Sequence, residues 1–125
     1  MDHKIIIEAG KASSEAILAE SQSAMAIWSS FPIESTCNIW GDEIYFSIPL
    51  FLSLDDTAKE IIEMGDLGYW PSGKAPCIFF GPTPIIGVGE IRPASAVNII
   101  GKIIGDPKIF KRMSQGARVH VAKAE

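Results

Sequence analysis

The sequence GDLGYWPSGKAPCIFFGPTP, residues 65–84, gathers glycine, proline and aromatic side chains in one stretch. Glycine permits positive φ and close backbone approach, whereas proline fixes φ and removes a backbone donor. These two residue types bracket apolar runs that are too short to be helices. The stretch therefore predicts two strands, at residues 66–70 and 75–80, joined by a tight turn. We build the expected fold outward from this pair.

The residues before this strand pair predict a hairpin followed by a helix. A β-branched run at residues 3–8 and a looser alternation at residues 11–18 are separated by a glycine turn, which indicates a hairpin. At residues 19–30, apolar side chains recur at three- and four-residue spacing, as in a helix with one buried face. We expect Trp28 to anchor that face.

A second hairpin is predicted from the alternating residues 33–40 and 43–48, which flank a Gly-Asp turn. Adjacent strand residues point to opposite faces, so Asp42 and Glu43 would not share one catalytic site, and we interpret them as a turn aspartate and a solvated glutamate. Residues 55–64 fit a helical turn and an extended segment equally well. On the return arm we expect Ile44, Phe46 and Ile48 on one face and Glu43, Tyr45 and Ser47 on the other.

The rest of the chain predicts a long loop, a strand, a helix and a last strand. Residues 81–94 carry three prolines and three glycines, which is typical of a loop that borders a functional site. We expect a strand at residues 95–104, a helix at residues 106–116 with an aspartate cap and proline in its first turn, and a strand at residues 117–122. The sum is a mainly β fold, a closed eight-stranded antiparallel barrel with two helices, because closure removes exposed strand edges.

Length, composition and charge narrow the functional classes. The 125 residues predict one domain, residues 1–125, and the net charge of −4 with scattered basic residues argues against a nucleic-acid partner. Apolar runs are far below the roughly 20 residues of a membrane helix, and the N-terminus lacks the apolar core of a signal peptide, so we expect a cytoplasmic protein without a membrane partner. Two cysteines and two histidines without metal-ligand spacing predict no metal and no cofactor.

Three long strings in this order resemble a small prokaryotic cyclophilin-like family whose members mostly have no assigned function. They are NIWGDEIYFSIP at residues 38–49, GDLGYWPSGKAPCIFFGPTP at residues 65–84 and PASAVNIIGKI at residues 93–103. The resemblance implies an eight-stranded barrel with two helices and a pocket on its outer face or rim, near the long loop. It does not imply the activity of the classical cyclophilins, because their Phe-His-Arg string is absent from this chain.

We predict that the protein binds a small ligand or a peptide segment at a rim pocket, and the candidate ligand-binding residues are Tyr69, Trp70, Lys74, Arg92 and Asn98. Aromatic rings with polar edges suit such recognition, although the same rings also suit a barrel core. Asn38, Trp40, Ser95 and Asn98 interrupt apolar strands and would orient a ligand if they converged on a pocket.

Two alternatives to ligand binding stay open. The first is a divergent peptidyl-prolyl isomerase, for which Arg92 in the long loop would be the donor to the prolyl amide. The second is a homo-oligomer formed through the apolar segment at residues 84–88, if that segment is exposed.

Overall fold

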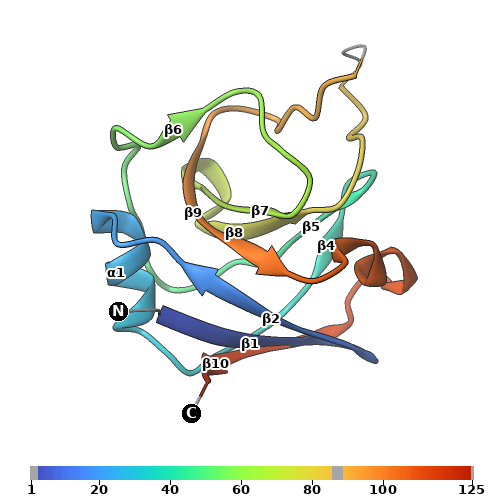
Figure 1. Ribbon diagram of the computed structural model, residues 1–125, viewed down its shortest axis with the longest axis horizontal. Coiled ribbons are helices and arrows are strands. Elements are labelled where there is room, and N and C mark those ends of the chain that lie inside the picture. Colours follow the sequence, from blue (N-terminus) through green and yellow to red (C-terminus); the bar gives the residue numbers. More distant parts are fainter. Residues whose placement is uncertain (1–2, 86–88, 125) are drawn as a thin grey trace.

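The computed structural model describes residues 3–85 and 89–124 of the chain, and these residues contain ten strands (Figure 1). The strands are β1 (His3–Ala9), β2 (Ala12–Leu18), β3 (Ile33–Thr36), β4 (Asn38–Ile39), β5 (Glu43–Tyr45), β6 (Ala58–Lys59), β7 (Asp66–Trp70), β8 (Ala75–Phe79), β9 (Val97–Ile104) and β10 (Arg118–Lys123). The predicted strand pair is therefore β7 and β8, and the segment at residues 55–64 is a loop that contains only the short β6.

Both predicted helical segments are present, but each is shorter than the pattern indicated. Helix α1 (Gln22–Trp28) begins at Ser21, whose side-chain oxygen accepts a hydrogen bond from the backbone N–H of Ala24. The second segment is the 3₁₀ helix η2 (Pro107–Arg112), capped by Asp106 as its sequence predicted. A third helical turn, η1 (Pro71–Gly73), joins β7 to β8.

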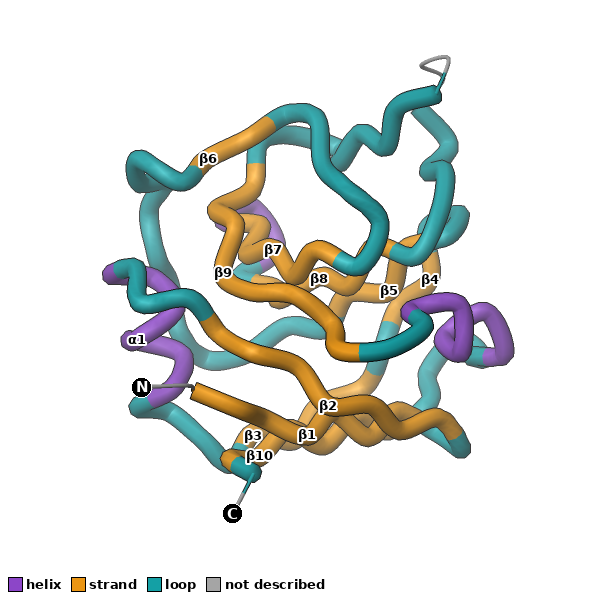
Figure 2. Tube along the Cα trace, viewed as in Figure 1, coloured by secondary structure: helices purple, strands orange, loops and turns teal. Residues whose placement is uncertain are grey.

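The strands form one antiparallel sheet that curls around a common interior (Figures 1 and 2). Its order is β3-β10-β1-β2-β9-β7-β8-β5-β4, with β6 paired to β9. The prediction of a closed eight-stranded barrel was wrong on both counts, because the described residues form ten strands and their hydrogen-bonded path ends at β3 and β4 without closing. Those two end strands are separated in the chain by Cys37 alone, so residues 33–39 pair first with β10 and then with β5.

The interior of the curled sheet holds the main hydrophobic core. Isoleucine and valine side chains from β1, β9 and β10 fill it together with Ala16 and Leu18 of β2 and with Ile44, Phe46 and Ile48, the face predicted to be apolar. Helix α1 covers the sheet with Ala24 and Ile27, whereas Trp28 is only half-buried. Phe110 of η2 is fully buried and packs near Phe80.

A second, smaller core lies apart from the main one and contains residues of β7, β8 and β9. Its buried members are Ile62, Cys77, Phe79 and Val97, and its partly buried members are Tyr45, Trp70, Ile91 and Ile99. Phe79 belongs to this cluster and its neighbour Phe80 to the main core, as the alternation of strand side chains predicted. We call this second cluster the outer core, and the candidate functional site lies beside it.

Candidate functional site

A pocket of about 130 Å³ lies at the outer core, between β5, the end of β7 and the loop that leads into β9. It is lined by Trp40, Glu43, Tyr45, Trp70, Pro93, Ala94 and Val97. The volume is well above the roughly 10–15 Å³ that one water needs. Apolar and aromatic walls with few polar groups are typical of sites for small ligands.

Glu43 is the polar group of this pocket, and its side chain is only 4% exposed. Strand alternation places it on the face opposite Ile44, where it shares the pocket wall with Trp70 and Val97 of the outer core and with Pro93 and Ala94. Burial raises the pKa of Glu43 from its ordinary 4.5 to about 7, and the neighbouring Cys77 thiol offsets part of that rise. Among the described residues, its Oε1 atom has no hydrogen-bond partner. Our interpretation of Glu43 as a solvated residue was therefore wrong.

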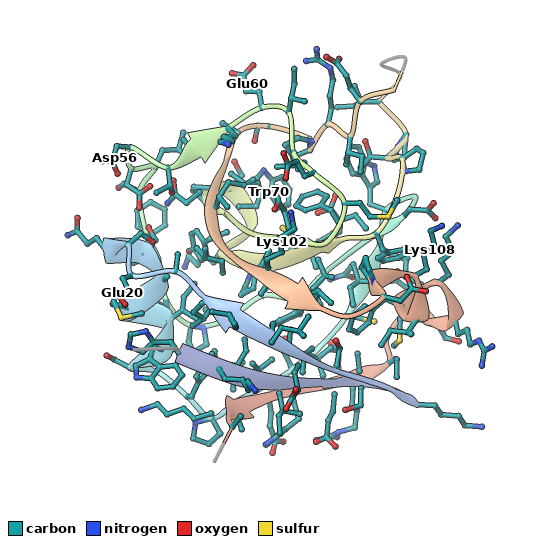
Figure 3. All side chains as sticks on the ribbon, in the orientation of Figure 1. Glu20, Asp56, Glu60, Trp70, Lys102 and Lys108 are labelled. Carbon is teal, nitrogen blue, oxygen red and sulfur yellow. The ribbon has the colours of Figure 1, made fainter. Side chains whose placement is uncertain are left out.

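The aromatic walls are held in fixed orientations. Tyr45 and Trp70 meet edge to face, with ring centroids 5.7 Å apart and planes at 80°. The indole N–H of Trp70 donates to the Ser95 hydroxyl at 2.7 Å, which ties β7 to the start of β9 (Trp70 is labelled in Figure 3). A Cβ at Gly73 would come within 2.7 Å of the Trp70 ring, so glycine there lets the indole lie against the turn.

The loop beside the pocket is anchored at its base. The backbone N–H of Ile62 donates to the carbonyl of Ile91 at 2.9 Å, which pairs the loop with the segment before β7. The Thr83 hydroxyl donates to the Arg92 carbonyl and so joins the two limbs of the loop. These contacts hold Pro93, which is buried, in the wall of the pocket.

The two aromatic residues predicted to bind ligand lie on opposite sides of β7. Trp70 lines the pocket. Tyr69 is fully buried in the main core, where its hydroxyl donates to the Leu50 carbonyl at 2.6 Å and accepts from the Leu52 N–H at 3.1 Å. Tyr69 therefore packs in the main core and lies outside the pocket.

The other predicted site residues also lie away from the pocket wall. Asn98 is fully buried, and its amide bonds Ser23, Ser53 and Asp55, so it joins α1 to the 53–55 segment. Lys74 is exposed and adopts left-handed φ of 50° after η1. The Arg92 guanidinium donates two hydrogen bonds to Glu90 at 2.8 and 3.1 Å.

The structure adds pocket residues that the pattern of the sequence did not bring together. Trp40, one of the amphipathic strand residues singled out, does line the pocket, and Ser95 positions Trp70. Glu43 and Tyr45 were predicted to share a face, and that face becomes enclosed by a loop more than forty residues later. Strand alternation identifies the face, but only the tertiary fold shows what covers it.

A wider depression of about 790 Å³ lies between the β1–β2 turn and η2. Its basic side chains, Lys11, Lys108 and Arg112, are all exposed to solvent. Exposed, solvated charges are less specific evidence of a site than a buried carboxyl in a formed pocket. We therefore take the outer-face pocket as the candidate site.

Neither a metal site nor a membrane helix is found in the part of the chain that the structure describes. Over residues 3–85 and 89–124, no three His, Cys, Asp or Glu side chains are placed to hold a metal ion. Over the same residues, no helix is long and apolar enough to cross a membrane. Of the segment at residues 84–88, considered above as an oligomer interface, residues 86–88 lie outside the described residues, and Ile85 is exposed.

Comparisons with known proteins give one family and one similar solved structure. A family model described as "Cyclophilin-like" matches residues 3–122. The solution structure of a hypothetical protein from Archaeoglobus fulgidus is similar, with 40% sequence identity and a TM-score of 0.83, over 98% of this chain and 95% of that one. A comparison with curated proteins found no match. Because the family model spans almost the whole chain, the protein belongs to the cyclophilin-like family.

Proposed function

We propose that the protein is a binding module that takes a small ligand, or one side chain of a peptide, in the outer-face pocket. Trp40, Tyr45 and Trp70 would contact the body of the ligand, and Glu43 would bind a polar group on it. The pocket is formed by fixed side chains, so the ligand would meet a largely pre-organised site.

The observation that supports this proposal is Glu43, whose carboxyl group is almost fully buried although the residue lines the pocket, and whose Oε1 atom has no partner among the described residues. An unsatisfied buried polar atom costs about 1–3 kcal/mol, so proteins keep few of them. A ligand donor in the pocket would recover this cost if the Glu43 carboxyl turned toward it. An apolar residue at position 43 would avoid it altogether, which makes the carboxyl hard to explain by packing alone.

The isomerase alternative receives less support from the same region. Isomerisation needs a donor aimed at the prolyl amide in its twisted state. Arg92, the arginine considered for that role, is engaged with Glu90 and is not among the residues that line the pocket. Binding without isomerisation is therefore the function that we propose.

The three tryptophans provide a direct test, because Trp40 and Trp70 line the pocket whereas Trp28 packs beside His3 and Phe31 at α1. We would screen small metabolites and short proline peptides by NMR and follow the three indole N–H signals. We expect hits that shift the signals of Trp40 and Trp70 and leave that of Trp28 in place.

Two matched variants complete this test. Trp70→Leu should abolish those hits, and Trp28→Leu should retain them. The proposal fails if every hit survives in Trp70→Leu, or if hits move only the Trp28 signal. A proline peptide whose cis–trans exchange is accelerated by the wild-type protein would instead favour the isomerase alternative.

A further inference from the structure

We infer that the pocket is selective for a small alkylammonium group that carries at least one N–H, as in a protonated secondary or tertiary methylamine. This inference rests on the binding function proposed above and specifies its ligand class. Three aromatic rings and a buried carboxyl are the features that carry it.

The charge of the lining excludes other ligand classes. Glu43 is the one carboxylic acid among the lining residues, and none of these residues is basic. An anion would be repelled by the carboxylate and would find no cation at the wall. A wholly apolar ligand would leave the Glu43 carboxyl without a polar partner. A cation with an N–H would be attracted to the carboxylate and could donate a charge-assisted hydrogen bond to it.

The aromatic walls favour an alkylated cation over a bare ammonium group. Tyr45 and Trp70, whose rings are perpendicular to each other, and Trp40 line a space large enough for a few heavy atoms. Cations are attracted to the faces of such rings, and methyl groups on nitrogen add apolar contact while lowering the cost of dehydration. Sets of aromatic rings beside a carboxyl are suited to methylated amines for this reason.

Binding of a cation at this site should depend on pH through Glu43. The carboxyl must be ionised to attract the ligand, and its pKa of about 7 means that binding near neutral pH releases a proton. The titratable neighbours are Cys77 on β8, whose pKa is raised well above its ordinary value by burial and by Glu43 so that it stays neutral, and Tyr45 on the same strand. The Arg92 and Glu90 charges in the adjoining loop pair with each other.

Three probes of similar size distinguish how the charge, the hydrogen-bond donor and the shape of a ligand each contribute to binding. Trimethylammonium has the charge and an N–H, tetramethylammonium has the charge alone, and tert-butanol has a hydroxyl donor without charge. We would titrate each into the full chain at pH 8 and follow the indole N–H signals of Trp40, Trp70 and Trp28. We expect trimethylammonium to bind tightest, by about tenfold or more over tert-butanol, because a desolvated cation gains both π and carboxylate contacts.

The variants compare the pocket carboxyl with a surface carboxyl. Glu43→Gln should remove the preference for trimethylammonium, and Trp40→Leu should weaken its binding several-fold. Glu34→Gln makes the same change at an exposed β3 site beside Arg118 and should have no effect. For wild type, affinity for trimethylammonium should fall between pH 8 and pH 6, whereas affinity for tert-butanol should stay constant.

The outcomes that overturn the inference differ from those that overturn the proposed function. Equal binding of trimethylammonium and tert-butanol, or a preference that persists in Glu43→Gln, would overturn the ligand class and leave a binding pocket. Failure of every probe to shift Trp40 and Trp70 would also overturn the ligand class. The proposed function then depends on the metabolite and peptide screen, in which hits at the same two indoles would still establish it.

Discussion

The main core and the outer-face pocket are built from alternate residues of the same strands, but they differ in whether their buried polar groups have hydrogen-bond partners. On β7, Tyr69 enters the main core, and both hydrogen-bonding roles of its hydroxyl are filled by Leu50 and Leu52. On β5, Glu43 faces the outer core with one oxygen unpartnered among the described groups. The polar group of Tyr69 is thus satisfied within the main core, whereas that of Glu43 is only partly satisfied by the described residues.

The largest expected effect comes from truncating the two neighbours on β7. Tyr69→Ala should lower the free energy of unfolding by roughly 3–5 kcal/mol, because it removes a fully buried ring. Trp70→Ala should cost less, since that ring is only partly buried at the pocket. Denaturant titration of both variants measures the difference. If both variants lost the same free energy of unfolding, the distinction between Tyr69 as a core residue and Trp70 as a pocket residue would be wrong.

A smaller effect is expected from the pH dependence of Glu43. The folded pKa of about 7 exceeds the ordinary 4.5, so between these values the folded state binds more protons than the unfolded state, and stability falls as pH rises. Below pH 4.5 Glu43 is protonated in both states and does not change the free energy of unfolding. Above pH 7 its destabilising contribution levels off at roughly 3 kcal/mol, since each unit of pKa difference corresponds to about 1.4 kcal/mol.

Glu43→Gln isolates this contribution from the other carboxyl groups. We expect the variant to match wild type near pH 4 and to be more stable near pH 8, as measured by denaturant unfolding across that range. Glu34→Gln, at an exposed position, serves as the control and should follow wild type. If wild type and Glu43→Gln kept a constant difference at every pH, the carboxyl would not be buried as described.

The smallest effect is expected at Lys74. Its side chain is exposed and its backbone keeps positive φ, so Lys74→Ala should change the free energy of unfolding by less than about 0.5 kcal/mol. Binding of trimethylammonium should also be unchanged. If isothermal titration showed that Lys74→Ala lost most of its affinity for trimethylammonium, the binding site would lie at the η1 turn and not on the outer face.

Much of the architecture follows from local sequence patterns. Turn residues bracket β7 and β8, alternation separates Ile44 from Glu43, and Asp106 caps η2. The hydrogen-bonded path of the sheet ends at β3 and β4, because β3 pairs with β10 and β4, just beyond Cys37, pairs with β5. This pairing depends on the tertiary fold and is not visible in the local sequence pattern.

The candidate site was harder to predict than the fold. Tyr69 and Trp70 have similar chemistry and adjacent positions, so the sequence offers no local reason to send one to the core and the other to the pocket. Once the register of β7 is known, alternation separates them. Glu43 resembled a surface glutamate because its covering loop lies far away along the chain. Asn98 attracted attention as a polar strand residue, and its three partners at distant positions account for it.

The separation of the outer core from the main core has a consequence for the pocket. None of Trp40, Glu43, Tyr45 and Trp70 belongs to the isoleucine-rich main core, so substitutions among them leave its buried side chains in place. The shape and polarity of the pocket wall can therefore vary while the interior of the sheet stays the same. Two chains with the same main core would in that case present differently shaped pockets on the outer face.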